Sequence, residues 1–198
     1  MRVLLIGGTS HTGKSTVARA AAERLGFTYR PTDLLARHPG RPWRTPEREV
    51  PPHVAEHYGT LGVDELIDSV LDHYAHLWPR IEELITEHAE GTGPGLVLEG
   101  SALWPSRVAA LDVPRVEAVW FTADEGVLAD RMHASARYGE ASAEERYLVD
   151  RFVARARRFQ QLVRESVDAA GLRRVDTTGR SVAELVEEIL AGHGRQGP

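Results

Sequence analysis

The sequence contains no cysteine, and this absence excludes several classes of function. A chain without cysteine forms no disulfide, uses no thiolate nucleophile and builds no cysteine-based zinc site. Long apolar runs are also missing, because no segment approaches the roughly 20 apolar residues that a membrane-spanning helix needs. We therefore expect a cytoplasmic protein that has no membrane partner.

Lysine is almost absent as well, although the chain is rich in arginine. Of its 24 lysine and arginine residues only Lys14 is a lysine, and it lies in the segment GGTSHTGKST at 7–16. An ammonium group binds phosphate as a compact point charge, whereas a guanidinium group presents a planar fork. The single retained lysine therefore indicates a specific function.

The size and charge of the chain describe a globular protein of one domain. Its 198 residues are enough to bury a core, and 42% of them are apolar while 27% are charged. The formal net charge of −5 argues against nonspecific attraction to nucleic acid. Either a monomer or a homodimer is compatible with this composition.

Short apolar runs alternate with segments of helical periodicity along the chain. The runs predict strands at 2–6, 27–30, 96–99, 116–121 and 172–175. Helices are predicted at 15–25 and 61–85, and the second of these is expected to be kinked or divided near Pro79. Three further helices are predicted to start at Ser/Thr-x-x-Glu capping boxes, whose first residues are Thr122, Ser142 and Ser181. This alternation predicts a three-layer α/β/α sandwich around a mostly parallel five-stranded sheet.

The strongest motif lies between the first predicted strand and the helix that follows it. Residues 8–15 match G-x-x-x-x-G-K-[ST], the phosphate-binding loop (P-loop) of nucleotide-binding proteins. Backbone N–H groups and Lys14 would hold phosphates, and the Ser15 hydroxyl would bind Mg²⁺. The alternative is a chance match in a strand–turn–helix unit. The nucleotide-binding candidates are Gly8, Thr9, Ser10, His11, Thr12, Gly13, Lys14, Ser15 and Thr16.

Two carboxylates are expected at the edge of the sheet where the P-loop lies. Asp33 follows the second predicted strand, where it would accept a proton from an attacking hydroxyl or, alternatively, cap the helical turn at 34–37. Glu99 ends the third predicted strand, where it would hold the metal's water or orient the acceptor. The alternative for Glu99 is a solvated strand end.

Arginines occur in three groups that suit a negatively charged ligand. Arg131 and Arg137 flank the end of a predicted helix before a break at 138–142, and such a segment can close over phosphates. A proline-rich loop at 38–52 and its flank carry Arg37, Arg41, Arg44 and Arg48, and Arg151, Arg155 and Arg158 share one face of a later helix. The alternative for the first group is a pair of surface arginines, and for the second group a solvated proline-rich insert. The third group would otherwise pair with acidic residues on another element.

The histidines give little guidance. His53 and His57 have i, i+4 spacing, but no HExxH pattern accompanies them and no third metal ligand is evident. His11 is unusual within a P-loop, where small residues are common, and either touches the ligand or faces solvent.

The chain resembles the small-molecule kinases of the P-loop superfamily, and more closely the 2-phosphoglycerate kinase family. The resemblance rests on residues 7–26, Thr32-Asp33, VLEGSALWP at 97–105 and the segment 147–178. It implies a P-loop NTPase fold with a helical lid, ATP and Mg²⁺ as cofactors, a lid arginine at Arg131 or Arg137, and an adenine-facing loop that includes Thr178. The chain departs from the family at 38–52 and the helix that follows.

These observations predict a kinase that transfers the γ-phosphoryl group of ATP to a hydroxyl of a small, anionic metabolite. The expected substrate-binding residues are Asp33, Arg37, Arg41, Arg44, Glu99 and Arg155, and the catalytic residues are Lys14, Asp33, Arg131 and Arg137. One domain would span 1–192, with an acceptor-binding insert at about 34–90, a lid at about 131–146 and a flexible tail at 193–198.

Two other functions fit the same motif. One is a resistance or toxin kinase that modifies an antibiotic or a nucleotide sugar. The other is a nucleotide-gated regulatory or binding module, which would bind ATP without phosphorylating a small molecule.

Overall fold

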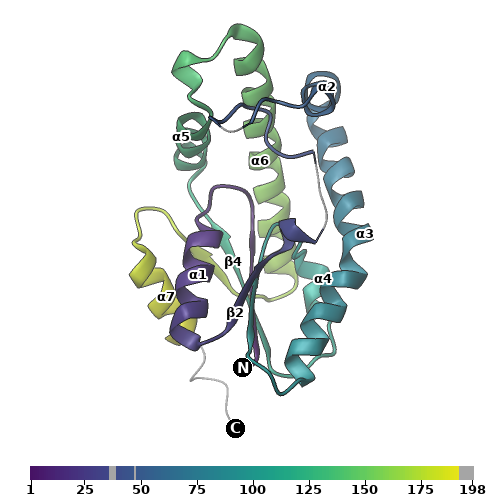
Figure 1. The fold of residues 1–198 in the computed structure, drawn as a ribbon, viewed down its shortest axis with the longest axis vertical. Helices are drawn as coiled ribbons and strands as arrows, with labels where there is room; N and C mark the ends of the chain where they lie inside the picture. Colours follow the sequence, from purple (N-terminus) through teal and green to yellow (C-terminus); the bar gives the residue numbers. More distant parts are fainter. Residues whose placement is uncertain (36–38, 47, 192–198) are drawn as a thin grey trace.

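A five-stranded parallel sheet lies between two layers of helices, as Figure 1 shows. The computed structural model describes residues 1–35, 39–46 and 48–191. The strands are β1 (Val3–Gly8), β2 (Thr28–Pro31), β3 (Leu96–Glu99), β4 (Val116–Thr122) and β5 (Arg174–Asp176), in the order β2-β3-β1-β4-β5. All four pairings are parallel, which confirms the predicted fold class.

Each face of the sheet is covered by its own apolar cluster. On one face, β1, β3 and β4 pack against α1 (Lys14–Leu25) and α7 (Val182–Ala191). The other face packs against α3 (Val63–Glu90), α4 (Pro105–Ala109) and α6 (Ala143–Ala169). None of the helices in the described ranges is long and apolar enough to cross a membrane.

A third apolar cluster lies beyond the carboxyl ends of the strands. It joins α2 (Pro52–Thr60), α5 (Glu125–Ala136) and the first half of α6, which rise above the sheet in Figure 1. Trp43, only 2% exposed, belongs to the same cluster and comes from the long connection between β2 and α2. This helical unit therefore includes part of the proline-rich segment.

Helix α6 connects the helical unit to the sheet, and buried polar groups fix it there. The side-chain amide of Gln160 accepts a hydrogen bond from the backbone N–H of Ala123 and donates one to its carbonyl oxygen, both at 3.0 Å. Arg164 donates to the same carbonyl oxygen at 3.2 Å, and Thr9 of the P-loop donates to the Ala156 carbonyl oxygen at 3.3 Å. The second half of α6 is thus attached to both β4 and the P-loop.

The predicted strands match the observed ones to within about two residues at each end, but one helix differs from its prediction. The helix predicted over 61–85 is continuous from Val63 to Glu90, so the division near Pro79 was wrong. A proline in a helix removes a hydrogen bond and costs about 3 kcal/mol. Pro79 is exposed while Leu77, Trp78 and Ile81 are buried, so apolar packing on both sides of the proline holds the helix together.

Two of the three predicted capping boxes are present. Ser142 and Ser181 each exchange hydrogen bonds with the glutamate three residues later. The box at Thr122 was wrong, because Thr122 is buried in β4, where it pairs with Asp176. Asp124 caps α5 instead and accepts hydrogen bonds from the backbone N–H groups of Gly126 and Val127.

The connection between β2 and α2 contains little regular structure in its described part. A 3₁₀ turn at Thr32–Leu34, labelled η1, follows β2, and Asp33 lies inside this turn rather than at its N-cap. Thr45 and Arg48 form an isolated β-bridge. The predicted binding residue Arg37, the second half of the predicted turn at 34–37, and the predicted tail at 193–198 lie outside the described residues.

We predict that Gln160→Ala lowers the free energy of unfolding by about 2–4 kcal/mol. The variant leaves two buried backbone groups of Ala123 with fewer partners, each at a cost of about 1–3 kcal/mol. Urea unfolding measures the change. Gln161→Ala is the matched control, because the neighbouring Gln161 is exposed and should change stability by less than about 0.5 kcal/mol. Equal effects of the two changes would contradict the anchoring role.

Candidate active site

The polar side chains of the site gather where three neighbouring parallel strands end. The P-loop follows β1, Thr32 and Asp33 follow β2, and Ser101 follows β3. Ligands of open α/β sheets bind at this carboxyl edge. The topology therefore places the predicted loop and the predicted carboxylates at one site.

The backbone of the P-loop needs glycine at two of its positions. Gly8 has φ 126°, and a Cβ there would lie 2.3 Å from the carbonyl oxygen of Phe121. Gly13 has φ 88° and adopts the left-handed conformation just before α1. The chain can thus turn sharply from β1 into α1, which directs the positive N-terminal end of the helix toward the loop.

The single lysine is buried inside this turn. Lys14 is 7% exposed, and its Nζ donates a hydrogen bond to the carbonyl oxygen of Thr9 at 2.5 Å. Burial lowers the pKa of Lys14, while the carboxylates of Glu99 and Asp33 act in the opposite direction. An ammonium group held this way suits an anionic ligand, because a phosphate would replace the solvation that burial removes.

Ser15 and Glu99 meet directly, although 84 positions separate them in the sequence. The Ser15 hydroxyl donates to Oε1 of Glu99 at 2.7 Å, and the Tyr29 hydroxyl donates to the same oxygen at 3.0 Å. Glu99 is 5% exposed, so the solvated strand end considered as an alternative was wrong.

The oxygens of Ser15 and Glu99 are of the kind that Mg²⁺ prefers, and they fit a divalent cation at the start of α1. The described residues contain no group of three or more histidine, cysteine or acidic side chains that would bind a metal by themselves. Mg²⁺ typically takes its remaining ligands from water and substrate phosphates, so this small donor set is sufficient.

His11 joins the P-loop to the helical unit. It adopts φ 63°, and its ring centroid lies 6.0 Å from that of Trp43 and 6.5 Å from that of Phe152. Arg131 of α5 donates to the His11 carbonyl oxygen at 3.0 Å. The pKa of His11 is lowered to about 4, first by burial and then by the cations of Arg41, Lys14 and Arg131. The imidazole is therefore neutral near pH 7.

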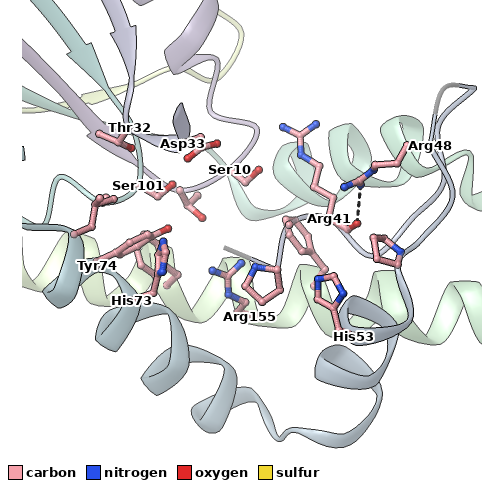
Figure 2. Close-up of a pocket in the computed structure, with 18 residues that line it drawn as sticks. Ser10, Thr32, Asp33, Arg41, Arg48, His53, His73, Tyr74, Ser101 and Arg155 are labelled. Atoms are coloured by element: carbon pink, nitrogen blue, oxygen red, sulfur yellow. Dashed lines mark hydrogen bonds between the residues drawn. The ribbon is translucent and has the colours of Figure 1, made fainter. Parts of the chain in front are cut away.

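A cavity of about 540 Å³ adjoins the P-loop on the side of β2 and β3. Figure 2 shows residues of the P-loop and strand ends along one side and residues of α3 and α6 along the other. Its polar lining residues are Thr9, Ser10, Thr32, Asp33, Arg41, Arg48, His53, His73, Tyr74, Ser101 and Arg155, and its apolar ones include Leu77, Phe152 and Phe159. The described part of the lining thus combines one carboxylate, three guanidinium groups and several hydroxyls.

Hydrogen bonds connect the cavity wall to the P-loop. Ser101 donates to the Gly8 carbonyl oxygen at 2.9 Å and forms a side-chain hydrogen bond with Tyr74. Burial raises the pKa of Tyr74 to about 12, so this hydroxyl stays protonated.

The three arginines of the cavity are held in different ways. Arg41 lies over the ring of Trp43 at 5.9 Å, and its carbonyl oxygen accepts a hydrogen bond from Arg48 at 3.1 Å. Arg155 donates to the Tyr58 hydroxyl at 3.4 Å, and its buried Nε has no hydrogen-bond partner among the described residues. Arg155 is half-buried, which makes it the least solvated cation of the three.

Other predicted site residues lie elsewhere. Arg44 lies 3.4 Å from Glu145 and, together with Arg137, lines a separate pocket of about 280 Å³ between residues 43–46 and the helical unit. Arg151 donates to the Leu61 carbonyl oxygen, and Arg158 lies 4.0 Å from Asp64. Of the three arginines predicted on one face of α6, only Arg155 lines the cavity at the P-loop.

The Thr178 hydroxyl accepts a hydrogen bond from the backbone N–H of Asp124 at 2.8 Å. This bond attaches the turn after β5 to the start of α5.

Several residues of the site had no functional prediction from the sequence. Trp43, Tyr29 and Tyr74 are aromatic residues without a motif, and Ser101 belongs to a segment quoted only for the family resemblance. His53 was set aside as a metal ligand, yet it lines the cavity. Tyr29 lies two residues before the end of β2, and only the pairing of β2 with β3 reveals that this position faces Glu99.

Comparisons with known proteins show the fold. No protein-family profile matches the chain, and no curated protein sequence is significantly similar to it. A gluconokinase from Sinorhizobium meliloti 1021 matches with a TM-score of 0.53 and 24% identity over 98% of this chain and 91% of that chain. Shikimate kinase from Aquifex aeolicus vf5 matches with a TM-score of 0.53 and 15% identity over 96% of this chain and 95% of that chain.

Shikimate kinase from Acinetobacter baumannii, solved with shikimate, has a TM-score of 0.51 and 13% identity over 98% of this chain and 94% of that chain. The chain therefore has the fold of the P-loop small-molecule kinases. The closer resemblance to the 2-phosphoglycerate kinases remains a prediction, because none of these three structures is such an enzyme.

We predict that the unfolding free energy falls as the pH is lowered from 6.5 to about 4, in part because of His11. In this window the unfolded chain binds a proton at His11 and the folded chain does not. His11→Asn is a suitable variant because asparagine tolerates a positive φ. It should reduce the change in unfolding free energy across this pH window by about 1–2 kcal/mol, a figure lowered because His11 is partly exposed to solvent. Urea unfolding across the window measures it. The control is His76→Asn, at an exposed position of α3, and equal slopes in both variants would contradict the prediction.

Proposed function

We propose that this protein is an ATP-dependent kinase that transfers the γ-phosphoryl group to a hydroxyl of a small, anionic metabolite. The observation that carries the proposal is the adjacency of two sites. A P-loop with a buried lysine lies beside a cavity whose lining includes the carboxylate of Asp33 and the guanidinium groups of Arg41, Arg48 and Arg155. One site fits the donor phosphates and the other fits a charged acceptor.

The phosphates of the donor would be bound by the loop itself. Its backbone N–H groups, the ammonium of Lys14 and the N-terminal end of α1 all present positive charge to them. Mg²⁺, when bound by Ser15 with Glu99 beside it, would neutralise charge on the β and γ phosphates. Arg131, which already contacts the loop at His11, is the arginine best placed to stabilise the charge that develops on the transferred group.

Asp33 is the residue we assign to the acceptor hydroxyl. It lies on the sheet side of the cavity near Ser10 of the P-loop, as Figure 2 shows. The hydroxyl oxygen bonds to the γ-phosphorus while its proton passes to the Asp33 carboxylate. The bond between the γ-phosphorus and the bridging oxygen breaks, and ADP leaves with those electrons.

The charge of the cavity favours an acceptor that is itself anionic. Among the described residues, three arginines against one carboxylate leave the lining positive, and the buried Nε of Arg155 has no hydrogen-bond partner. A carboxylate or phosphate on the acceptor would supply that partner at a site partly shielded from water. Arg44 and Arg137 are not needed for this assignment, because they line the other pocket.

Other features of the proposal rest on the sequence and on the neighbours of known fold. They include the use of ATP, an adenine-facing role for the turn at 176–178, closure of the lid at about 131–146, and a cytoplasmic location. The acceptor-binding insert at about 34–90 belongs to the same group, although part of it forms the cavity wall.

We predict that Lys14→Ala lowers the rate of acceptor-dependent ADP release by about 100-fold or more, because one preorganised cation at the transferring group is lost. Lys14→Arg should fail as well, since a planar fork does not fit the buried position of a compact ammonium. ADP release is measured with a panel of hydroxy acids and sugar acids. Arg24→Ala, an exposed cation at the other end of α1, is the control. Turnover of Lys14→Ala at the wild-type rate would show that the mechanism is wrong.

We also predict that Arg155→Gln raises the KM for an anionic acceptor by roughly 10- to 100-fold, since a hydrogen bond to a charged group contributes about 1.5–3 kcal/mol. The affinity for ADP, measured by calorimetry, should stay within about twofold of wild type. Arg157→Gln is the matched control, because Arg157 is exposed on the same helix and lies 4.0 Å from Glu125. An unchanged KM in Arg155→Gln would refute the anionic acceptor.

A further inference from the structure

The register of the sheet places Tyr29 beside Glu99. Tyr29 of β2 lies opposite Val97 of β3, and Val97 and Glu99 are two positions apart on that strand. Side chains two apart point to the same face of a sheet. Because Val97 packs in the cluster that contains α1, Tyr29 and Glu99 also face α1, at whose start Ser15 lies.

Hydrogen bonds from two hydroxyls converge on one carboxylate oxygen at this point. Oε1 of Glu99 accepts from Ser15 at 2.7 Å and from Tyr29 at 3.0 Å. An ionised carboxylate only accepts, and each hydroxyl has a single proton to donate. The Tyr29 hydroxyl also lies within hydrogen-bonding reach of Ser15. Because the proton of Ser15 is donated to Glu99, a lone pair of Ser15 is left for a cation.

The ring of Tyr29 is itself held in place by the helix that carries Ser15. The guanidinium carbon of Arg19 lies 5.1 Å from the centre of the Tyr29 ring. Arg19 is four residues after Ser15, which is one helical turn along the same face of α1. Tyr29 is thus fixed by Arg19 through its ring and by Glu99 through its hydroxyl.

We propose that Tyr29 is a positioning residue for the divalent cation that accompanies the nucleotide. Its hydroxyl holds the Glu99 carboxylate in the orientation in which Oε1 receives the Ser15 proton, so that the Ser15 oxygen presents a lone pair to the metal. This inference rests on the proposed function, since it assumes that Ser15 binds the metal of a metal–nucleotide complex. Partners that orient metal ligands typically change metal affinity by 10- to 100-fold.

The test is the Mg²⁺ dependence of ADP binding, measured by calorimetry on the full chain in EDTA and in saturating Mg²⁺. Tyr29→Phe removes one oxygen atom and leaves the ring under Arg19. We expect it to reduce the gain in ADP affinity that Mg²⁺ provides by about tenfold, while the affinity in EDTA stays the same. Mn²⁺ titration followed by electron paramagnetic resonance, with ADP present, should show the same loss of metal affinity.

Tyr138→Phe is the matched control. The Tyr138 hydroxyl donates to a carboxylate oxygen of Asp150 at 2.9 Å, a comparable bond in the turn between α5 and α6. This variant should keep the wild-type Mg²⁺ dependence, whereas Glu99→Gln should lose at least as much of it as Tyr29→Phe.

The outcomes separate the inference from the proposed function. An unchanged Mg²⁺ dependence in Tyr29→Phe, or an equal loss of ADP affinity with and without Mg²⁺, overturns the positioning role alone. If the wild-type chain binds ADP in neither condition, the proposed function fails and the inference fails with it.

Discussion

The buried ammonium group of Lys14 constrains the surrounding structure more than any other single charge. Moving a charge out of water costs several kcal/mol unless nearby groups replace the lost solvation. Here the Thr9 carbonyl oxygen accepts one of its protons, and the carboxylates of Glu99 and Asp33 favour its charged form. Because these partners come from the P-loop, β3 and the turn after β2, one cation links the ends of three strands.

A second constraint is the attachment of the helical unit to the P-loop. Trp43 is buried against Phe152 at a ring distance of 4.9 Å and packs beside His11. Gln160 fixes the far half of α6 to the end of β4. The wall of the cavity is therefore built on the P-loop at one end and on the sheet at the other, which places Arg41 and Arg155 beside the same cavity.

The sequence predicted those parts of the site that depend on neighbours along the chain. The P-loop lies within nine residues, so its glycines, Lys14 and Ser15 could be assigned together, and Asp33 and Glu99 followed from the ends of apolar runs. The arginines were harder to assign. Arg41 and Arg44 are three residues apart in the same proline-rich loop, and the sequence does not distinguish their roles. They line different pockets because Trp43 between them is buried.

The sequence alone therefore determined the fold class, the P-loop and the edge of the sheet at which ligands bind, since these follow from local periodicity and from the way parallel strands end. Tertiary structure decided which distant side chains meet there. The register of β2 against β3 brings Tyr29 to Glu99, and the packing of α3 against α6 brings Tyr74 and Arg155 to the cavity. Such contacts depend on the exact register between two strands or on the burial of one aromatic ring. Neither of these can be predicted from the sequence pattern.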